Sequence, residues 1–187
     1  MNYTVESIGD FTGGRTFIAL PGSNISNVII DHRDIHWQSA LFVAFKGSKF
    51  DGHAFIPELI DRGVRNFLVT DQGVIDAHKG GANFILCQNV VQAMQAIAKN
   101  HRRGFKIPVI GVAGSNGKTI VKEWLNSLLE HQHQICRSPK SYNSQIGAAL
   151  SVLQLKSKHT LGIFEAGISQ PDEMPNLQKV IDPSIGI

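Results

Sequence analysis

Residues 109–119 place the tightest constraint on the fold of this chain. They form an apolar run that enters a glycine-rich turn and ends in Lys-Thr, with the sequence Val-Ile-Gly-Val-Ala-Gly-Ser-Asn-Gly-Lys-Thr. Small residues in the turn allow backbone N–H groups to point inward around a phosphate. Apolar residues at 121, 125, 128 and 129 then recur at helical spacing, so we expect a helix from Lys118 to about His131. This strand, loop and helix predict a nucleoside-triphosphate site.

The chemistry of the loop follows from its last two residues. Lys118 would reach the β- and γ-phosphates, and the Thr119 hydroxyl would ligate Mg²⁺. The general pattern G-x-x-x-x-G-K-[ST] places its first glycine at position 112, where this chain has Val112. A chance loop is the alternative, and the helix that follows argues against it. The predicted ATP-binding residues are therefore Gly114, Ser115, Asn116, Gly117, Lys118 and Thr119.

Two later segments carry further candidate groups. Glu165 comes at the end of the apolar run 161–164, where an open α/β sheet places its ligands. Its carboxylate is positioned to hold Mg²⁺ against a triphosphate, and a solvated acid at a strand end is the alternative. The polar segment 138–145 could hydrogen-bond a substrate or simply cap the next helix. Composition does not separate these two interpretations.

The pattern along the chain predicts alternating strands and helices. We expect an α/β protein with a small N-terminal domain over residues 1–87 and a P-loop domain with a parallel sheet over 88–187. The chain ends on what looks like the opening of another strand, which suggests an N-terminal part of a longer protein. The expected strands are 41–45, 66–70, 83–87, 109–113, 160–166 and 183–187, and the expected helices are 56–62, 90–103, 118–131, 147–155 and 173–181.

Composition narrows the classes of function. The chain has 187 residues, 42% of them hydrophobic, and a net charge of only +3. We expect no membrane span and no signal peptide, which favours a cytoplasmic protein. The basic cluster 101–103 could be a nucleic-acid patch, but the end of an amphipathic helix commonly carries such residues. We therefore expect no nucleic-acid partner.

Several motifs carry a family resemblance. Residues 111–119 resemble the G-x-[TA]-G-[ST]-N-G-K-T loop of the Mur ligases, which also departs from the general P-loop at the position of Val112. Residues 31–33, 41–47 and 51–55 resemble the D-[ST]-R, L-F-V-A-L-K-G and D-[GA]-H-x-F pattern of the uridine-nucleotide-binding domain of these ligases. The two sets of motifs occur in the order found in that family.

The resemblance implies an activity and a set of site residues. Mur ligases are ATP-dependent amide-bond-forming enzymes of peptidoglycan precursor synthesis, and this chain looks most like the branch that adds D-Ala-D-Ala to UDP-N-acetylmuramoyl-tripeptide. The reaction passes through an acyl phosphate, with ATP and Mg²⁺ required. Lys118 and Asn143 would be catalytic, and Thr119 and Glu165 would hold the metal. The implied substrate-binding residues are Asp31, Arg33, Lys46, Asp51, Gly52, His53 and Asn143.

Some residues depart from the family pattern, and other readings stay open. His32 replaces a hydroxyl residue, Ile120 replaces a second hydroxyl after the lysine, and Asp172 stands where glycine is common. The sister ligase that adds the third peptide residue shares both sets of motifs. A nucleotide-binding module without activity is the other alternative, because the resemblance stops within the ATPase domain. The remainder of a ligase chain, or a fused alanine racemase, would be its covalent partner.

Overall fold

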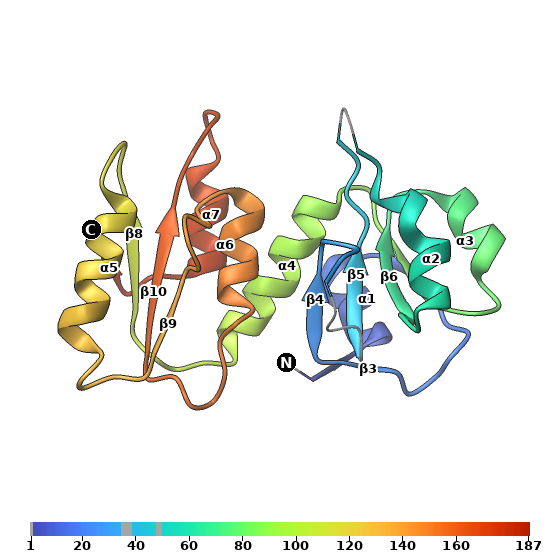
Figure 1. The fold of residues 1–187 in the computed structure, drawn as a ribbon, viewed down its shortest axis with the longest axis horizontal. Coiled ribbons are helices and arrows are strands. Elements are labelled where there is room, and N and C mark those ends of the chain that lie inside the picture. Colours follow the sequence, from blue (N-terminus) through green and yellow to red (C-terminus); the bar gives the residue numbers. More distant parts are fainter. Residues whose placement is uncertain (1, 35–38, 48–49) are drawn as a thin grey trace. The chain divides into compact units, whose positions relative to one another are not determined.

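The structure is a computed structural model that describes residues 2–34, 39–47 and 50–187 (Figure 1). Residues 48 and 49 of the predicted uridine-nucleotide loop lie outside this part. The chain divides into two compact units, Met1–Ala93 and Met94–Ile187. Helix α4 (Val90–Arg103) crosses this division, and most of its length belongs to the second unit. A functional boundary after Cys87 remains a prediction.

The first unit is built on a five-stranded sheet. Its strand order is β2-β7-β6-β5-β4, and all neighbours are parallel except the pair β2 and β7. Every residue of β5 and β6 is buried, as expected for central parallel strands covered on both faces. The strands are β2 (Arg15–Phe17), β4 (Asn27–Ile29), β5 (Ala40–Val43), β6 (Asn66–Val69) and β7 (Asn83–Leu86).

Short helices and one small ribbon complete this unit. Apolar residues of α2 and α3 pack into the same core cluster as the central strands. The remaining elements are β1 (Tyr3–Thr4), which pairs with β3 (Asn24–Ile25), helix α1 (Val5–Thr12), the 3₁₀ turn η1 (Gly52–Phe55), α2 (Ile56–Asp61) and α3 (Gln72–His78).

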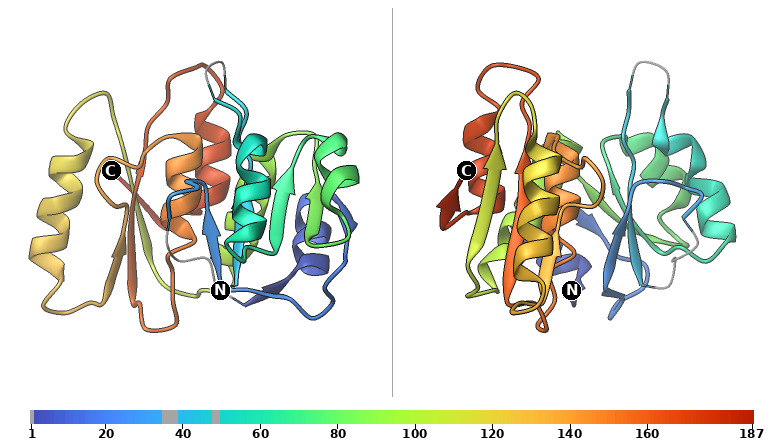
Figure 2. Two further views of the ribbon diagram at one scale, coloured as in Figure 1. Left: turned by 45° about the vertical axis from the view of Figure 1, so that its right-hand side comes forward. Right: turned by 60° about the vertical axis from the view of Figure 1, so that its left-hand side comes forward.

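The second unit is built on four parallel strands in the order β11-β8-β10-β9. Helix α5 packs on one face of this sheet and helices α6 and α7 on the other, as the two views in Figure 2 show. The elements are β8 (Val109–Ala113), α5 (Lys118–Leu129), β9 (Ile135–Arg137), α6 (Gln145–Val152), β10 (Leu161–Ala166), α7 (Met174–Ile181) and β11 (Ile185–Gly186). The predicted α/β class with a parallel sheet is confirmed.

The sequence analysis missed the smaller elements. It predicted none of β1–β4, α1, α3 or β9. The missed strands have only two or three residues each, which is too short for a measurable periodicity. Helix α3 has a signal that was overlooked, since the Asp71 carboxylate accepts a hydrogen bond from the Gly73 amide as an N-cap. Helix α5 also ends at Leu129, two residues before the predicted end.

The basic cluster 101–103 ends helix α4 as the helix-end interpretation predicted. Arg102 is 6% exposed, and its guanidinium donates to the carbonyl oxygens of Phe105, Ile107, Ile181 and Asp182. These bonds join the end of α4 to the end of α7 within the second unit. Arg102 is therefore part of the packing of this unit. Within the described residues, no helix is long and apolar enough to cross a membrane.

Candidate functional site

The glycine-rich loop connects β8 to α5 and leaves its backbone exposed. Gly114 and Gly117 have φ values of 140° and 79°, which side chains with a Cβ rarely adopt. The Lys118 ammonium folds back over the loop and donates to the carbonyl oxygen of Gly114 across 2.7 Å. Helix α5 begins directly after Gly117, and no side chain in the described part of the chain caps its first turn. The first N–H groups of this helix thus face the loop, as they do where helices bind phosphate.

The sheet explains why Val112 stands where the general P-loop pattern has a glycine. Val112 is 1% exposed, lies in β8, and is the register partner of Glu165 in β10. Its side chain belongs to the core cluster beneath α5, together with Ile110 and Ile163. A glycine here would remove a buried side chain from the sheet, so the turn begins two residues later at Gly114.

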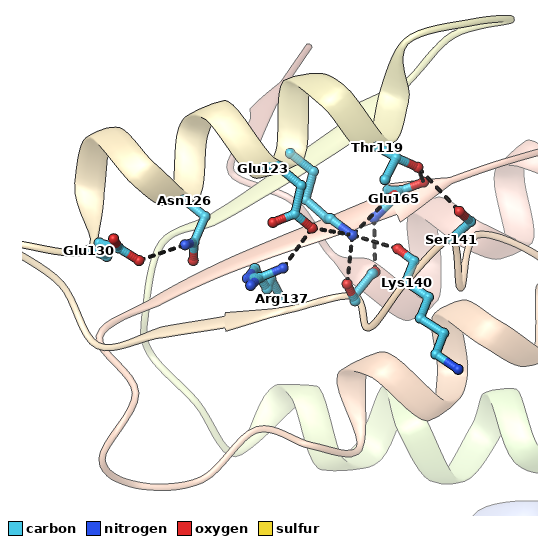
Figure 3. A network of polar contacts seen from close by, with 10 residues as sticks. Thr119, Glu123, Asn126, Glu130, Arg137, Lys140, Ser141 and Glu165 are labelled. Carbon is cyan, nitrogen blue, oxygen red and sulfur yellow. Dashed lines mark hydrogen bonds and ion pairs between the residues drawn. The ribbon is translucent and has the colours of Figure 1, made fainter.

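Glu165 is a buried carboxylate on the face of the sheet that carries α5. Alternation along β10 places it on the same side as Leu161 and Ile163. Its side chain is fully buried, and Thr119 Oγ1 donates to Glu165 Oε2 across 3.1 Å (Figure 3). The structure thus places Glu165 beside the loop hydroxyl, and the metal-binding role predicted for the two residues stays a prediction. The alternative of a solvated acid at a strand end is wrong, because a fully buried group is not solvated.

Lys122 is a residue of this site that the sequence analysis did not single out for chemistry. It follows Thr119 by three positions on α5, so both side chains lie on one face of the helix. Its side chain has no exposed surface, and its ammonium lies 3.0 Å from Glu165 Oε1. The spacing Lys-Thr-x-x-Lys could have indicated Lys122. Buried lysines are rare, however, so the sequence alone favours an exposed side chain at this position.

The segment 138–145 caps the next helix and also contacts the glycine-rich loop, while its hydrogen bonding to a substrate stays a prediction. Ser144 caps α6, with its hydroxyl accepting from the Gly147 amide, so the helix-capping interpretation is confirmed. The same segment also reaches the nucleotide loop, because Ser141 Oγ lies 3.4 Å from Thr119 Oγ1 (Figure 3). Asn143 is held beside the end of β10, where the Gly167 amide donates to the backbone carbonyl oxygen of Asn143.

A glycine makes the placement of Asn143 possible. A Cβ on Gly167 would come within 2.9 Å of the Asn143 side chain, so only glycine allows this approach. The structure therefore brings Lys118, Thr119, Asn143 and Glu165 to the carboxyl ends of β8 and β10. Parallel α/β sheets bind their ligands at this edge.

The donor set suits a hard cation such as Mg²⁺. Thr119 Oγ1 and Glu165 Oε2 are oxygen donors 3.1 Å apart. Within the described residues there is no group of three or more His, Cys, Asp or Glu side chains that could hold a metal. Mg²⁺ is usually bound through one or two protein oxygens, with substrate phosphates and waters completing the shell. One carboxylate and one hydroxyl fit that pattern.

In the first unit, Asp31 and Arg33 form a paired group just after β4. Arg33 donates to both carboxylate oxygens of Asp31, at 2.9 and 2.7 Å, and its backbone amide donates to Oδ1. These hydrogen bonds hold the pKa of Asp31 well below its usual range, against the opposing effect of burial. The Arg33 side chain is 78% exposed. The guanidinium of Arg33 is therefore accessible to a ligand.

The Asp51-Gly52-His53 motif is held together from within. His53 Nδ1 lies 2.6 Å from Asp51 Oδ1, and Lys46 Nζ lies 3.4 Å from Asp51 Oδ2. Burial raises the pKa of Asp51, but the bonds to His53 and Lys46 outweigh it and lower that pKa overall. A Cβ on Gly52 would lie 3.0 Å from backbone atoms of Phe45, so the strand and the turn require glycine here.

Both ring nitrogens of His53 are used inside the protein. The residue is 5% exposed, and its Nε2 accepts a hydrogen bond from the Thr70 amide at 3.1 Å. Since Nε2 is an acceptor, Nδ1 carries the proton and donates to Asp51. The ring thus ties the motif to the end of β6. The substrate-binding role predicted for His53 stays a prediction, and in this geometry it would act through Asp51.

Aromatic stacking joins the two motifs of the first unit. The ring of His32 stacks on Phe55 with centroids 3.8 Å apart and 13° between planes, and Phe50 stacks on the same ring at 5.3 Å. His32, which stands where the Mur ligase pattern has a hydroxyl residue, therefore packs against Phe55 of the motif 51–55. Asp31, Arg33, Lys46 and Asp51 are brought into one region of the first unit.

Taken with the glycine loop and the buried carboxylate, the parallel sheet defines an α/β nucleotide-binding protein. Residues 13–130 match the Mur ligase family, catalytic domain, and residues 112–187 match the Mur ligase middle domain. The chain belongs to the Mur ligase family.

Two similar curated proteins carry the same name. The UDP-N-acetylmuramoyl-tripeptide--D-alanyl-D-alanine ligase of Borreliella burgdorferi is 33% identical over 176 residues, covering 88% of this chain and 38% of the relative. The ligase of the same name from Bacillus subtilis is 31% identical, covering 87% of this chain and 35% of the relative. The chain thus spans somewhat more than a third of the length of these relatives.

Solved structures show the same fold. A crystal structure of MurF from Acinetobacter baumannii is similar with a TM-score of 0.90 at 23% identity, covering all of this chain and 40% of that one. The structure of MurF ligase from Thermotoga maritima in complex with ADP has a TM-score of 0.73 at 27% identity, covering 84% of this chain and 35% of that one. The order of two α/β units is therefore that of MurF structures.

Proposed function

We propose that this chain supplies the uridine-nucleotide-binding and ATP-binding parts of a cytoplasmic ligase that adds D-Ala-D-Ala to UDP-N-acetylmuramoyl-tripeptide. The observation that carries the proposal is the convergence of Lys118, Thr119 and Glu165 at one edge of the parallel sheet. The names of the curated relatives support the choice of substrates, and the ADP complex of a similar structure supports the nucleotide.

The residues suit the activation of a carboxylate by ATP. A carboxylate is a poor acyl donor until phosphate replaces its oxygen as the leaving group. In the proposed reaction the carboxylate of the tripeptide attacks the γ-phosphorus and ADP leaves, and the amine of D-Ala-D-Ala then displaces phosphate from the acyl phosphate. Lys118 would release Gly114 and bind the β- and γ-phosphate oxygens, and the loop amides would orient the triphosphate.

Thr119 and Glu165 would hold Mg²⁺, which when bound neutralises phosphate charge. Asn143 would contact the muramoyl peptide from beside Gly167, with its backbone held by that residue. In the first unit, Arg33 and Lys46 would meet the diphosphate, because both side chains are more than two-thirds exposed and cationic. Asp31 and the Asp51-Gly52-His53 turn would hold these cations in place.

Calorimetric titration of the chain tests this assignment of two sites. We expect binding of UDP-N-acetylmuramoyl-tripeptide and, separately, of ATP with Mg²⁺. Lys118→Ala should abolish triphosphate binding and leave uridine-nucleotide binding within about twofold, a change of under about 0.5 kcal/mol. Loss of both ligands in this variant would contradict the two-site assignment.

The sister ligase that adds the third peptide residue is the nearest alternative. Product analysis with the full-length protein, supplied with ATP and either the muramoyl dipeptide or the tripeptide, distinguishes the two. Formation of the pentapeptide product from the tripeptide and D-Ala-D-Ala supports the proposal. ATP hydrolysis that ignores both muramoyl peptides would instead indicate a nucleotide-binding protein with another role.

A further inference from the structure

The ammonium of Lys122 lies in a cage of four oxygen atoms. It donates to the carbonyl oxygens of Ser138 at 2.8 Å and Lys140 at 2.5 Å. Glu165 Oε1 and Glu123 Oε1 lie 3.0 and 3.1 Å away. The Lys122 side chain is wholly buried, so this cation has exchanged its water shell for protein oxygens.

The cage joins three segments that surround the nucleotide loop. Lys122 belongs to α5, Glu165 to β10, and the two carbonyl groups to the segment between β9 and α6. Ser138 is itself buried, and its hydroxyl accepts a hydrogen bond from the Glu165 amide. A single cation thus fixes the distance between the helix, the strand and the segment that leads to Ser141 and Asn143.

The two oxygens of Glu165 have different partners. Oε1 faces Lys122 as an ion pair and makes no further hydrogen bond within the described residues, while Oε2 accepts from Thr119. Because the ammonium holds Oε1, only Oε2 is turned toward the loop hydroxyl. Glu123 is shared with Arg137, whose guanidinium lies 2.6 Å from the same Oε1 atom of Glu123 (Figure 3). Lys122 therefore has Glu165 as its only fully buried carboxylate partner among these groups.

We propose that Lys122 is a positioning residue of the nucleotide site, which holds Glu165 so that a single carboxylate oxygen faces the metal position beside Thr119. This inference rests on the proposed function, since it assumes that ATP binds at this loop.

The test compares nucleotide binding with and without Mg²⁺ in the 187-residue chain. Calorimetry with ATP is done in EDTA and again in excess Mg²⁺, for the unaltered chain, Lys122→Met and Glu165→Gln. Lys122→Met removes the charge and leaves an unbranched side chain that is one atom shorter. Lys179→Met is the matched control, because Lys179 is an exposed lysine on α7 of the same unit.

We expect Mg²⁺ to strengthen ATP binding by about tenfold or more in the unaltered chain and in Lys179→Met. An effect of this size is expected when one strong contact is added. In Lys122→Met and Glu165→Gln the gain should fall below about threefold, while binding in EDTA changes by less than about threefold. A Lys122→Met variant that keeps the full gain from Mg²⁺ would overturn the proposal. Failure of the unaltered chain to bind ATP at all would instead overturn the proposed function.

Thermal unfolding separates a positioning role from packing alone. Lys122→Met leaves the Glu165 carboxylate buried without its cation, whereas Lys122→Met combined with Glu165→Gln removes both charges of this buried pair. We expect the double variant to melt at a higher temperature than Lys122→Met, even if the single variant is unfolded under the assay conditions. A double variant that is no more stable than Lys122→Met would show that the two residues do not act together.

Discussion

The hydroxyl of Thr119 donates to Glu165 Oε2 across 3.1 Å, although the two residues are 46 positions apart in the chain. The contact exists because β8 and β10 are parallel neighbours in register, with α5 packed over both. A loop hydroxyl and a buried carboxylate are thus presented together at one edge of the sheet. This pair is the smallest part of the candidate site that can be tested by itself.

Replacing Thr119 tests the hydroxyl. Thr119→Val keeps the branched shape, and we expect the gain in ATP affinity from Mg²⁺ to fall to less than about threefold. It also leaves Oε2 of Glu165 without its donor, which should cost about 1–3 kcal/mol of stability. Thr119→Ser retains the hydroxyl and should behave as the unaltered chain in calorimetry and thermal unfolding. Equal loss in both variants would contradict a role for the hydroxyl.

Substitution of Val112 tests why this loop departs from the general P-loop pattern. Val112→Gly restores the glycine of that pattern but removes a buried side chain from β8. We expect a loss of about 3 kcal/mol in the free energy of unfolding and no gain in ATP affinity. Ala113→Gly, at the exposed neighbouring position, is the control and should cost about 1 kcal/mol or less. Denaturant unfolding and calorimetry make the comparison.

His53 and Arg33 are expected to act differently on uridine-nucleotide binding. His53→Ala should destabilise the first unit by about 2 kcal/mol, because the Thr70 amide and the Asp51 carboxylate lose buried partners. Arg33→Ala should leave the stability within about 0.5 kcal/mol but weaken binding of UDP-N-acetylmuramoyl-tripeptide about tenfold or more. If Arg33→Ala left the affinity unchanged, the exposed guanidinium would have no role in binding.

The backbone conformation at Asp172 explains why glycine is common at this position in the family. Its φ is 65°, the left-handed region in which glycine carries no steric penalty. We expect Asp172→Gly to stabilise the second unit by up to about 1 kcal/mol, since relief of strain exceeds the added entropy of the unfolded chain. Asp172→Ala keeps the Cβ and should not stabilise. Thermal unfolding of both variants decides, and equal melting temperatures would contradict the role of strain.

The stability of the chain should fall in mild acid because of His101. Burial lowers the pKa of His101 below its ordinary value of 6.5. The unfolded chain therefore binds a proton more readily than the folded one, so the stabilisation is complete above pH 6.5 and is lost as the pH falls below it. His101→Gln can still donate to the Leu155 carbonyl oxygen and should show a weaker pH dependence. An unchanged dependence would exclude His101 as its source.

Much of the fold could be predicted from the sequence. The helix over 90–103 agrees with the structure at both ends, and the strand 109–113 and the start of the helix at Lys118 agree as well. The helices are long enough to show a clear periodicity, and Gly and Pro residues mark where the segments begin and end. Strand β9 has three residues, and its pairing with β10 rather than local preference forms it.

The sequence by itself determined the loop, its Lys-Thr ending, the acid at 165 and the order of the two units, because each is a local pattern of residue types. Only the tertiary structure decided that Glu165 is buried and that Lys122 holds one of its oxygens. It also decided that His53 points inward to Asp51 and Thr70. Such facts depend on parallel strands and a helix that meet across 16 to 46 positions, and no local pattern carries that pairing. The loop sequence predicts a phosphate site, and the packing of α5 on β10 places Lys122 and Glu165 together beside that loop.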